Sequence, residues 1–178
     1  MREAIGATWI MGIVIAFVAL FSAYLAFSIN YSKAFRVKNG IVERIEKHNG
    51  FYRDEDAGAG ETSTVRDIYD FMNEINYGST GDCQRVVTSK AIQENYNTAD
   101  YIGCLNDRCF ANAQGQQHYC IQKITSKTQS DQLTTAYYKV YVFFAIDFPI
   151  LHDADYFFVT TGETKSLSYP KDSWLNFS

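Results

Sequence analysis

The sequence predicts an α+β fold in which a long N-terminal transmembrane helix carries a small disulfide-containing head with an antiparallel sheet. Three observations predict this architecture. Residues 5–29 form an apolar run that contains no charged side chain. Four cysteines lie close together in the middle of the remaining chain. Segments rich in aromatic and β-branched residues follow these cysteines, and such segments favour strands over helices.

Residues 5–29 are long enough to cross a membrane. A helix rises about 1.5 Å per residue, so about 20 apolar residues span a hydrocarbon core of about 30 Å. Trp9 at one end, and Tyr24 and Tyr31 at the other, suit the aromatic belts of the two membrane interfaces. A signal peptide has a shorter apolar region and a more basic start than Met1-Arg2-Glu3, so we expect the segment to be retained. The alternative is a buried core helix of a soluble protein.

Residues 30–49 are expected to continue the same helix as an amphipathic extension, so that the N-terminal helix covers residues 1–49. Asn39-Gly40 weakens the helix and predicts a kink or a break. His48-Asn49-Gly50 predicts the helix end, with the glycine in a left-handed cap. The apolar positions of the extension recur at spacings of three and four residues, and they are Ala34, Phe35, Ile41, Val42 and Ile45.

An acidic, glycine-rich segment at 50–63 predicts a flexible linker, and residues 64–178 are expected to form the α+β head. The head begins with a second helix. Thr64 is its expected N-cap, with Asp67 three residues later. One apolar face of this helix is predicted from Val65, Ile68, Met72 and Ile75.

Short strands are expected at 83–89 and 118–125, around the cysteines. The clearest strand is 136–148, in which Tyr138, Val140, Val142, Phe144, Ile146 and Phe148 form one apolar face. The opposite face is expected to be partly wet.

Two further segments complete the predicted antiparallel meander. Pro149 stops the long strand, and 155–161 returns as its neighbour. Gly162 is then expected to turn the chain into a last strand at 163–169.

The cysteines predict two disulfides in an oxidising compartment, with three pairings open. They are Cys83, Cys104, Cys109 and Cys120. A zinc site built from three of these cysteines and His118 is the alternative, but its spacing is unusual. A cation at 152–155 is disfavoured because the segment lacks enough ligands. We therefore expect no metal and no cofactor.

Charge and motifs exclude two classes of function. The net charge is −4 and the pI is about 5.3, so nucleic acid is not an expected partner. No Gly-x-Ser-x-Gly elbow, phosphate-binding loop or His-Glu-x-x-His helix occurs in the sequence, and we expect no enzymatic activity.

Two signals oppose each other on membrane topology. Only Arg2 precedes the span, whereas Lys33, Arg36 and Lys38 follow it, and this distribution places the C-terminal domain in the cytoplasm. The cysteines place it outside. We follow the cysteines and expect a single-pass membrane protein with its C-terminal domain outside the cell membrane.

The stretch "GATWIMGIVIAFVALFSAYLAFSINYSKAFRVKNGI", residues 6–41, resembles the N-terminal segment of TadE-like proteins of tight-adherence pilus systems. An apolar helix followed by an amphipathic half and a disulfide-containing sheet is also similar to the architecture of type IV pilins. The resemblance implies a structural subunit of an extracellular filament or secretion pseudopilus. Its partners would be the membrane before assembly, and afterwards copies of itself or other pilin-like subunits.

One position departs from that family. If Gly6 is the cleavage residue, Met11 stands where the family usually carries a glutamate, so peptidase processing is not expected to follow the family pattern. Glu3 is the only acid near the start of the span, and with an unprocessed N-terminus it is a candidate for pairing with Arg2 or with a neighbouring subunit's amine. Its alternative is to remain in interfacial water.

Helix assembly is assigned to Glu3, Gly6, Gly12 and Ala16, because small residues allow close contact between helices. The second hypothesis is a membrane-anchored, extracytoplasmic module that binds a ligand or protein. Its candidate surface contacts are Tyr137, Tyr141 and Phe143, on the less apolar face of the long strand. The favoured alternative for these three side chains is that they pack beneath the second helix.

Overall fold

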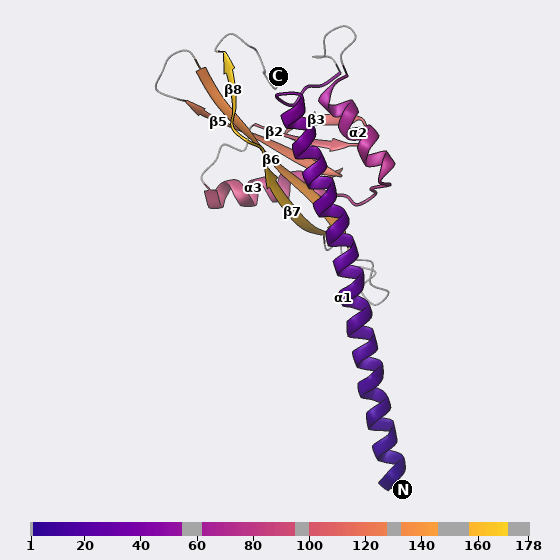
Figure 1. Cartoon of the computed structure of the whole chain (residues 1–178). Coiled ribbons are helices and arrows are strands. Elements are labelled where there is room, and N and C mark those ends of the chain that lie inside the picture. Colours follow the sequence, from indigo (N-terminus) through magenta and orange to yellow (C-terminus); the bar gives the residue numbers. More distant parts are fainter. Residues whose placement is uncertain (1, 55–61, 95–99, 128–132, 146–156, 171–178) are drawn as a thin grey trace.

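A computed structural model describes residues 2–54, 62–94, 100–127, 133–145 and 157–170. Figure 1 shows one long helix, α1 (Arg2–Lys47), with a compact head around its C-terminal half. The N-terminal half of α1 extends away from the head as a bare rod. The long apolar helix and the small antiparallel-sheet domain that the sequence predicts are therefore confirmed.

The head is built on a six-stranded antiparallel sheet, in which the strand order is β3-β2-β5-β6-β7 and β8 also pairs with β6. Its strands are β2 (Tyr101–Leu105), β3 (Arg108–Ala111), β5 (Tyr119–Lys127), β6 (Leu133–Ala145), β7 (Phe157–Glu163) and β8 (Leu167–Pro170). A separate short pair joins β1 (Gly81–Asp82) to β4 (Gln116–Gln117). The predicted strands at 118–125 and 136–148 correspond to β5 and β6, and residues 146–156 lie outside the described part of the chain.

The predicted turn at Gly162 is wrong. Gly162 lies inside β7 opposite Val140, and β8 then pairs with the same strand, β6, in the same direction. Three residues, 164–166, face two on β6, so the interruption is a β-bulge rather than a hairpin. At the bulge, the amide of Tyr138 donates to the Thr164 hydroxyl at 2.9 Å instead of to a strand carbonyl.

The predicted strand at 83–89 is also wrong, because this segment forms helix α3 (Cys83–Glu94). The Asp82 carboxylate accepts the Arg85 amide at 3.1 Å and so satisfies a free donor at the helix start. Val86 and Val87 are both buried, together with Cys83, on the side that faces the sheet. A short apolar run such as this one fits a helix and a strand equally well by periodicity alone.

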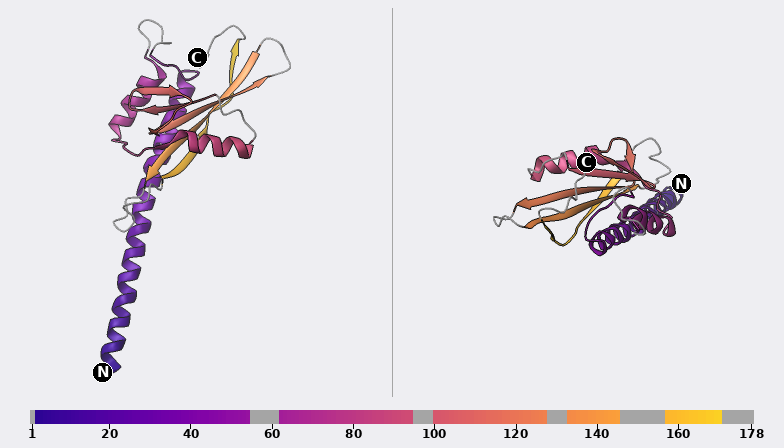
Figure 2. Two further views of the ribbon diagram at one scale, coloured as in Figure 1. Left: turned by 180° about the vertical axis from the view of Figure 1, so that it is seen from behind. Right: turned by 90° about the horizontal axis from the view of Figure 1, so that it is seen from above.

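Helices cover both faces of the sheet, as the view from above in Figure 2 shows. α1 and α2 (Thr64–Glu74) pack on one face, where the larger cluster of buried side chains lies. α3 packs on the other face. The expectation of a partly wet second face is therefore wrong over the part that α3 covers, because Tyr141 and Phe143 are fully buried there.

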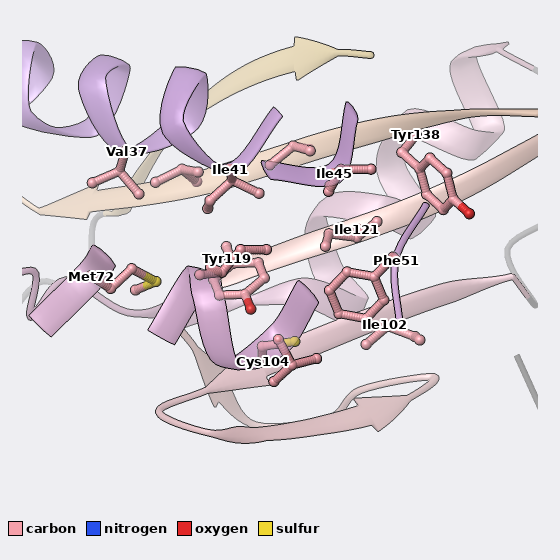
Figure 3. Close-up of a cluster of buried hydrophobic side chains, with 14 of the residues drawn as sticks. Val37, Ile41, Ile45, Phe51, Met72, Ile102, Cys104, Tyr119, Ile121 and Tyr138 are labelled. Carbon is pink, nitrogen blue, oxygen red and sulfur yellow. The ribbon is translucent and has the colours of Figure 1, made fainter. Parts of the chain in front are cut away.

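The C-terminal half of α1 belongs to the head's core. Its buried positions are Ala34, Val37, Ile41 and Ile45, and Figure 3 shows three of them facing Ile121 and Tyr138 of the sheet. Phe35, which the sequence placed on this face, is 43% exposed, and Val37 takes its place. The buried positions thus follow spacings of three, four and four residues along one stripe.

α1 continues through Asn39-Gly40 without a break, contrary to the expected interruption. Gly40 is buried where α2 crosses α1, and a Cβ at this position would lie 2.2 Å from ring carbons of Phe71. The glycine therefore allows close approach of the two helices rather than marking a kink.

The ends of the two packed helices differ from the predictions by one residue. Asn49, not Gly50, adopts the left-handed conformation at the end of α1, with φ of 53°. The Gly50 amide donates to Ile45 at 2.9 Å, which completes a Schellman cap. Ser63, not Thr64, is the N-cap of α2, and the buried Thr64 hydroxyl instead donates to the Gly50 carbonyl at 3.0 Å.

The predicted disulfides are confirmed, and the structure chooses one of the three pairings. Cys83 joins α3 to Cys120 in β5, and Cys104 joins Cys109 across the β2–β3 hairpin. All four cysteines are used, so none is left as a thiolate for the zinc alternative.

The two disulfides are expected to contribute unequally to stability. Replacing Cys83 and Cys120 by alanine should lower the free energy of unfolding by about 4 kcal/mol, and replacing Cys104 and Cys109 by about 2 kcal/mol. The reason is the difference in the loops that they close, because the paired residues are 37 and 5 positions apart. Urea unfolding of the full chain in detergent measures both values. A larger loss from the hairpin disulfide would contradict this reasoning.

Candidate functional site

The N-terminal half of α1 is the largest apolar surface of the described chain. The large apolar side chains from Trp9 to Ile29 are all more than a third exposed, and the most apolar stretch of the helix has none of its residues buried. By length and composition, this helix is suited to cross a membrane once. From Trp9 to Leu25 the protein therefore offers a rod of exposed apolar side chains, and Phe27 near its C-terminal end contacts the head.

A stripe of small residues runs along this bare half. We name it the small-residue stripe, and it consists of Gly12, Ala16, Ala19, Ala23 and Ala26 at alternating spacings of four and three residues. With 3.6 residues per turn, such spacings keep all five positions on one side of the helix. Ala23 and Ala26 are half-buried, whereas a Cβ at Gly12 would meet no atom within 4 Å.

The small-residue stripe lies on the same side of α1 as the residues that pack into the head. Two further steps of four residues lead from Ala26 through Asn30 to Ala34, the first buried residue of the head-facing stripe. Bulky side chains such as Ile10, Val14 and Phe21 lie on the other side of the helix. One side of α1 thus contributes buried residues to the core of the head in its C-terminal half. The same side carries the small-residue stripe in its N-terminal half.

The predicted assembly residues divide between described and undescribed positions. Gly12 and Ala16 belong to the small-residue stripe. Glu3 and Gly6 lie in the first turns of α1, before the residues whose side chains the structure describes. Ala19, Ala23 and Ala26 were not predicted from the sequence, although they recur at helical spacings of three and four residues, as the head-facing positions do.

An aromatic cluster joins the bare half of α1 to the head. The ring of Phe27 lies 5.9 Å from Phe144 and 5.9 Å from Phe158, edge-on to both. Tyr31 lies edge-on to Phe144 at 5.8 Å, and Phe144 stacks on Phe158 at 5.4 Å. These contacts place the lower ends of β6 and β7 directly against the last turns of the apolar run, so the head begins where the run ends.

The three proposed surface contacts do not form a surface patch. The Tyr141 side chain is fully buried, and its hydroxyl donates to the Gln122 side chain at 3.0 Å. Phe143 is fully buried against Phe157, with ring centroids 5.2 Å apart. Tyr137 is half-buried. The assignment of Tyr141 and Phe143 as contact residues is therefore wrong, because α3 and its neighbours cover that face.

Four polar side chains gather where α2 begins beside the end of α1. Asp67 accepts hydrogen bonds from Arg44 Nε at 3.1 Å and from His48 Nε2 at 3.0 Å, and Lys47 Nζ lies 3.5 Å away. The Arg44 guanidinium also stacks on the Phe71 ring at 3.8 Å. Partial burial raises the pKa of Asp67, but the His48 hydrogen bond and the charges of Arg44 and Lys47 together hold it below the ordinary value of 3.8.

This cluster ties the two helices together rather than building a reactive centre. The shallow pocket beside it is lined by Lys47, His48, Thr62 and Asp67. Asp67 was predicted as part of the helix cap, and it instead pairs across to α1. His118, the other candidate ligand, donates from Nδ1 to the Ser79 carbonyl at 2.8 Å. Within the described residues, no three His, Cys, Asp or Glu side chains are grouped so that they would hold a metal ion.

No protein-family model, curated protein or solved structure matches this chain. The resemblance to TadE-like proteins therefore rests on the N-terminal segment of the sequence alone.

The ion pairs of Asp67 are expected to make stability depend on pH. Asp67→Asn should lower the free energy of unfolding by about 1 to 2 kcal/mol at pH 7, because charge-assisted hydrogen bonds are lost. Since the folded-state pKa is lowered, ionised Asp67 stabilises the fold above its ordinary pKa, and this stabilisation is lost as the pH falls through the lowered value. The difference from wild type should therefore fade below about pH 4.

Urea unfolding between neutral and acidic pH measures this difference. Asp70→Asn is the matched control, because Asp70 lies on the same helix and is exposed. An Asp67→Asn effect that persists unchanged in acid would show that the ion pairs are not its cause.

Proposed function

We propose that this protein is a structural, non-enzymatic subunit that assembles through α1 into a pilin-like surface filament or secretion pseudopilus. The observation that carries the proposal is the small-residue stripe on the bare half of α1. A helix that served only as a tether would need apolar length, but not a continuous seam of small side chains.

The physics of the membrane supports assembly through this seam. Lipid tails are as apolar as the side chains of the helix, so exchanging lipid for protein contacts costs little hydrophobic free energy. Close packing between helices then decides association, and small residues let two backbones approach. An open position such as Gly12, with no atom near its missing Cβ, leaves room for a neighbouring helix.

The assembled partners in this proposal are further copies of the chain or other pilin-like subunits. The resemblance of residues 6–41 to TadE-like proteins supports that choice. Because the span contains no glutamate, the subunit seam relies on packing rather than on pairing with a terminal amine. Glu3, which precedes the span, is a candidate for pairing with a neighbouring subunit's amine outside this seam.

The proposed location is the cell membrane, with the head outside, and afterwards the filament. Two disulfides support an oxidising compartment for the head. Among the basic residues that oppose this topology, Lys38 has a role in the fold. Its Nζ lies 4.0 Å from the Phe35 ring, and a Cβ at Gly162 would lie 2.9 Å from its Cδ, so its stem packs against β7.

Blocking the small-residue stripe should abolish assembly. Gly12→Leu combined with Ala16→Leu adds bulk to the seam while the helix stays apolar and long enough to span. Shearing intact cells and detecting the head by antibody should then recover roughly tenfold less protein with surface appendages, which corresponds to about 1.4 kcal/mol of lost association. The amount retained in the membrane should stay the same or rise.

The matched control is Val14→Leu combined with Val18→Leu. These residues have the same spacing, are 54% and 57% exposed, and lie away from the stripe. This control should assemble like wild type. If the wild-type protein never leaves the cells with appendages, or if both double variants assemble equally, the filament proposal is wrong and a simple membrane tether is favoured.

A further inference from the structure

Besides the bare half of α1, an exposed apolar side chain of the head lies next to the end of the apolar run. Phe158, near the start of β7, is 43% exposed although its ring stacks on the buried Phe144 and contacts Phe27. The adjacent Phe157 is half-buried on the other side of the same strand. We name the exposed Phe158 and its contact Phe27 the lower rim of the head, and Figure 1 shows this end of β7 close to α1.

The position of Phe27 along α1 fixes the depth of the lower rim. Glu3 and Phe27 are 24 residues apart in the sequence. At about 1.5 Å per residue, this separation is about 36 Å along the helix. A hydrocarbon core is about 30 Å thick, and about 40 to 45 Å with its headgroup regions. If the charged residues Arg2 and Glu3 lie at one interface, Phe27 lies in the headgroup region of the other, and Phe158 beside it does too.

The charges next to the lower rim fit the same level. Lys33 and Arg36 follow Phe27 by about 1.7 and 2.5 turns and are exposed, so their long side chains can extend toward lipid phosphates. On the opposite face of the sheet, the exposed Arg85 lies 5.6 Å from the Phe157 ring. Cationic side chains close to exposed aromatic rings suit the headgroup level, where a charged tip can contact phosphates while an apolar body meets lipid.

We propose that the head is seated on the bilayer, with Phe158 inserted beside Phe27 into the headgroup region and with Lys33 and Arg36 facing lipid phosphates. The proposal rests on α1 spanning a membrane, which the proposed function shares, but it does not depend on filament assembly. Phe158 is then a second membrane anchor, supplied by the sheet rather than by the helix. The head has no free stem between itself and the membrane surface, because the aromatic contacts already reach Phe27.

A phospholipid surface is the occupant that the geometry favours. When α1 spans the bilayer with Arg2 and Glu3 at one interface, the lower rim already lies at the headgroup level of the other. No separate binding event is needed. The rim is continuous with the span, and the described exposed charges that follow it along α1, Lys33 and Arg36, are positive and complement lipid phosphates. A second copy of the chain covering Phe158 is the alternative outcome of the test.

Tryptophan fluorescence tests this seating directly. The sequence contains two tryptophans, Trp9 and Trp174, which are replaced by phenylalanine to give a background without tryptophan. Phe158→Trp in this background keeps an aromatic ring at the lower rim. Phe110→Trp is the matched control, because Phe110 is 50% exposed on the edge strand β3 and has no contact with α1 among the described ring contacts. The full chain is reconstituted in vesicles of phosphatidylcholine and phosphatidylglycerol that carry shallow or deep brominated lipids.

The emission of the Phe158→Trp protein is expected to be blue-shifted and quenched several-fold more by shallow than by deep brominated lipid. The emission of the Phe110→Trp protein is expected to show no quenching. Equal emission from the two variants, or no quenching of the Phe158→Trp protein, would overturn the proposal. Quenching that disappears as the protein-to-lipid ratio rises would assign the rim to a second copy instead, which also overturns it.

Two further measurements separate failed seating of the head from failed insertion of α1 and from effects of assembly. Trp9 alone, with Phe158 intact, reports whether α1 is inserted, so a failure of insertion is distinguished from a failure of seating. Adding Gly12→Leu and Ala16→Leu to the Phe158→Trp protein should leave its quenching unchanged, because the seat does not require assembly. If Phe158→Trp fails to form both disulfides, a spin label at Phe158→Cys replaces it. That cysteine is the one free thiol, since the four native cysteines are paired.

Discussion

The packing of α1 across the sheet is the interaction on which the rest of the structure depends. Without the C-terminal half of α1, the face of the sheet that carries Ile121, Tyr138 and Val140 would be exposed to water. The same helix leaves the head without a break and becomes the apolar rod. The head and the rod are therefore one body, and the orientation of the rod's sides is set by the core of the head.

Because α1 is one continuous helix, the same side of it faces the sheet in its C-terminal half and carries the small-residue stripe in its N-terminal half. Above, the side of the helix that faces the sheet carries Ala34, Val37, Ile41 and Ile45. Below, the same side carries small residues, and it emerges from beneath the head at Ala26. Disulfides and α3 close the far face of the sheet, so the exposed large apolar side chains of the described residues lie on α1 and at the lower rim, apart from Phe110 on the edge strand β3. Exposed apolar surfaces of this kind are expected to contact a membrane or other helices.

Sequence patterns predicted the elements whose signals are long and regular. The apolar run, the strand with alternating Tyr138, Val140 and Val142, and the paired cysteines are such signals. Helix α3 was missed because Val86 and Val87 form a run too short to have a period. The continuation of β7 into β8 was missed because a glycine in a strand often marks a turn, whereas Gly162 makes room for Lys38.

The candidate site shows the same limit. The periodic spacing of small residues was available in the sequence, but Gly12 and Ala16 were predicted from their small size alone, and Ala19, Ala23 and Ala26 were missed. The burial of Tyr141 and Phe143 was not, because a strand's second face is covered or open depending on an element elsewhere in the chain. The pairing of Asp67 with Arg44 and His48 depends in the same way on how two helices cross.

The central claim is that the small-residue stripe is the contact between subunits in the membrane. Intermolecular disulfide formation tests it most directly, because the four native cysteines are paired and one added cysteine is the only free thiol. Single variants Gly12→Cys, Ala16→Cys and Ala19→Cys should form cross-linked dimers on mild oxidation in membranes, and Val14→Cys, Val18→Cys and Phe21→Cys should not. Equal cross-linking on both sides of the helix, or cross-linking only from the bulky side, would contradict the account.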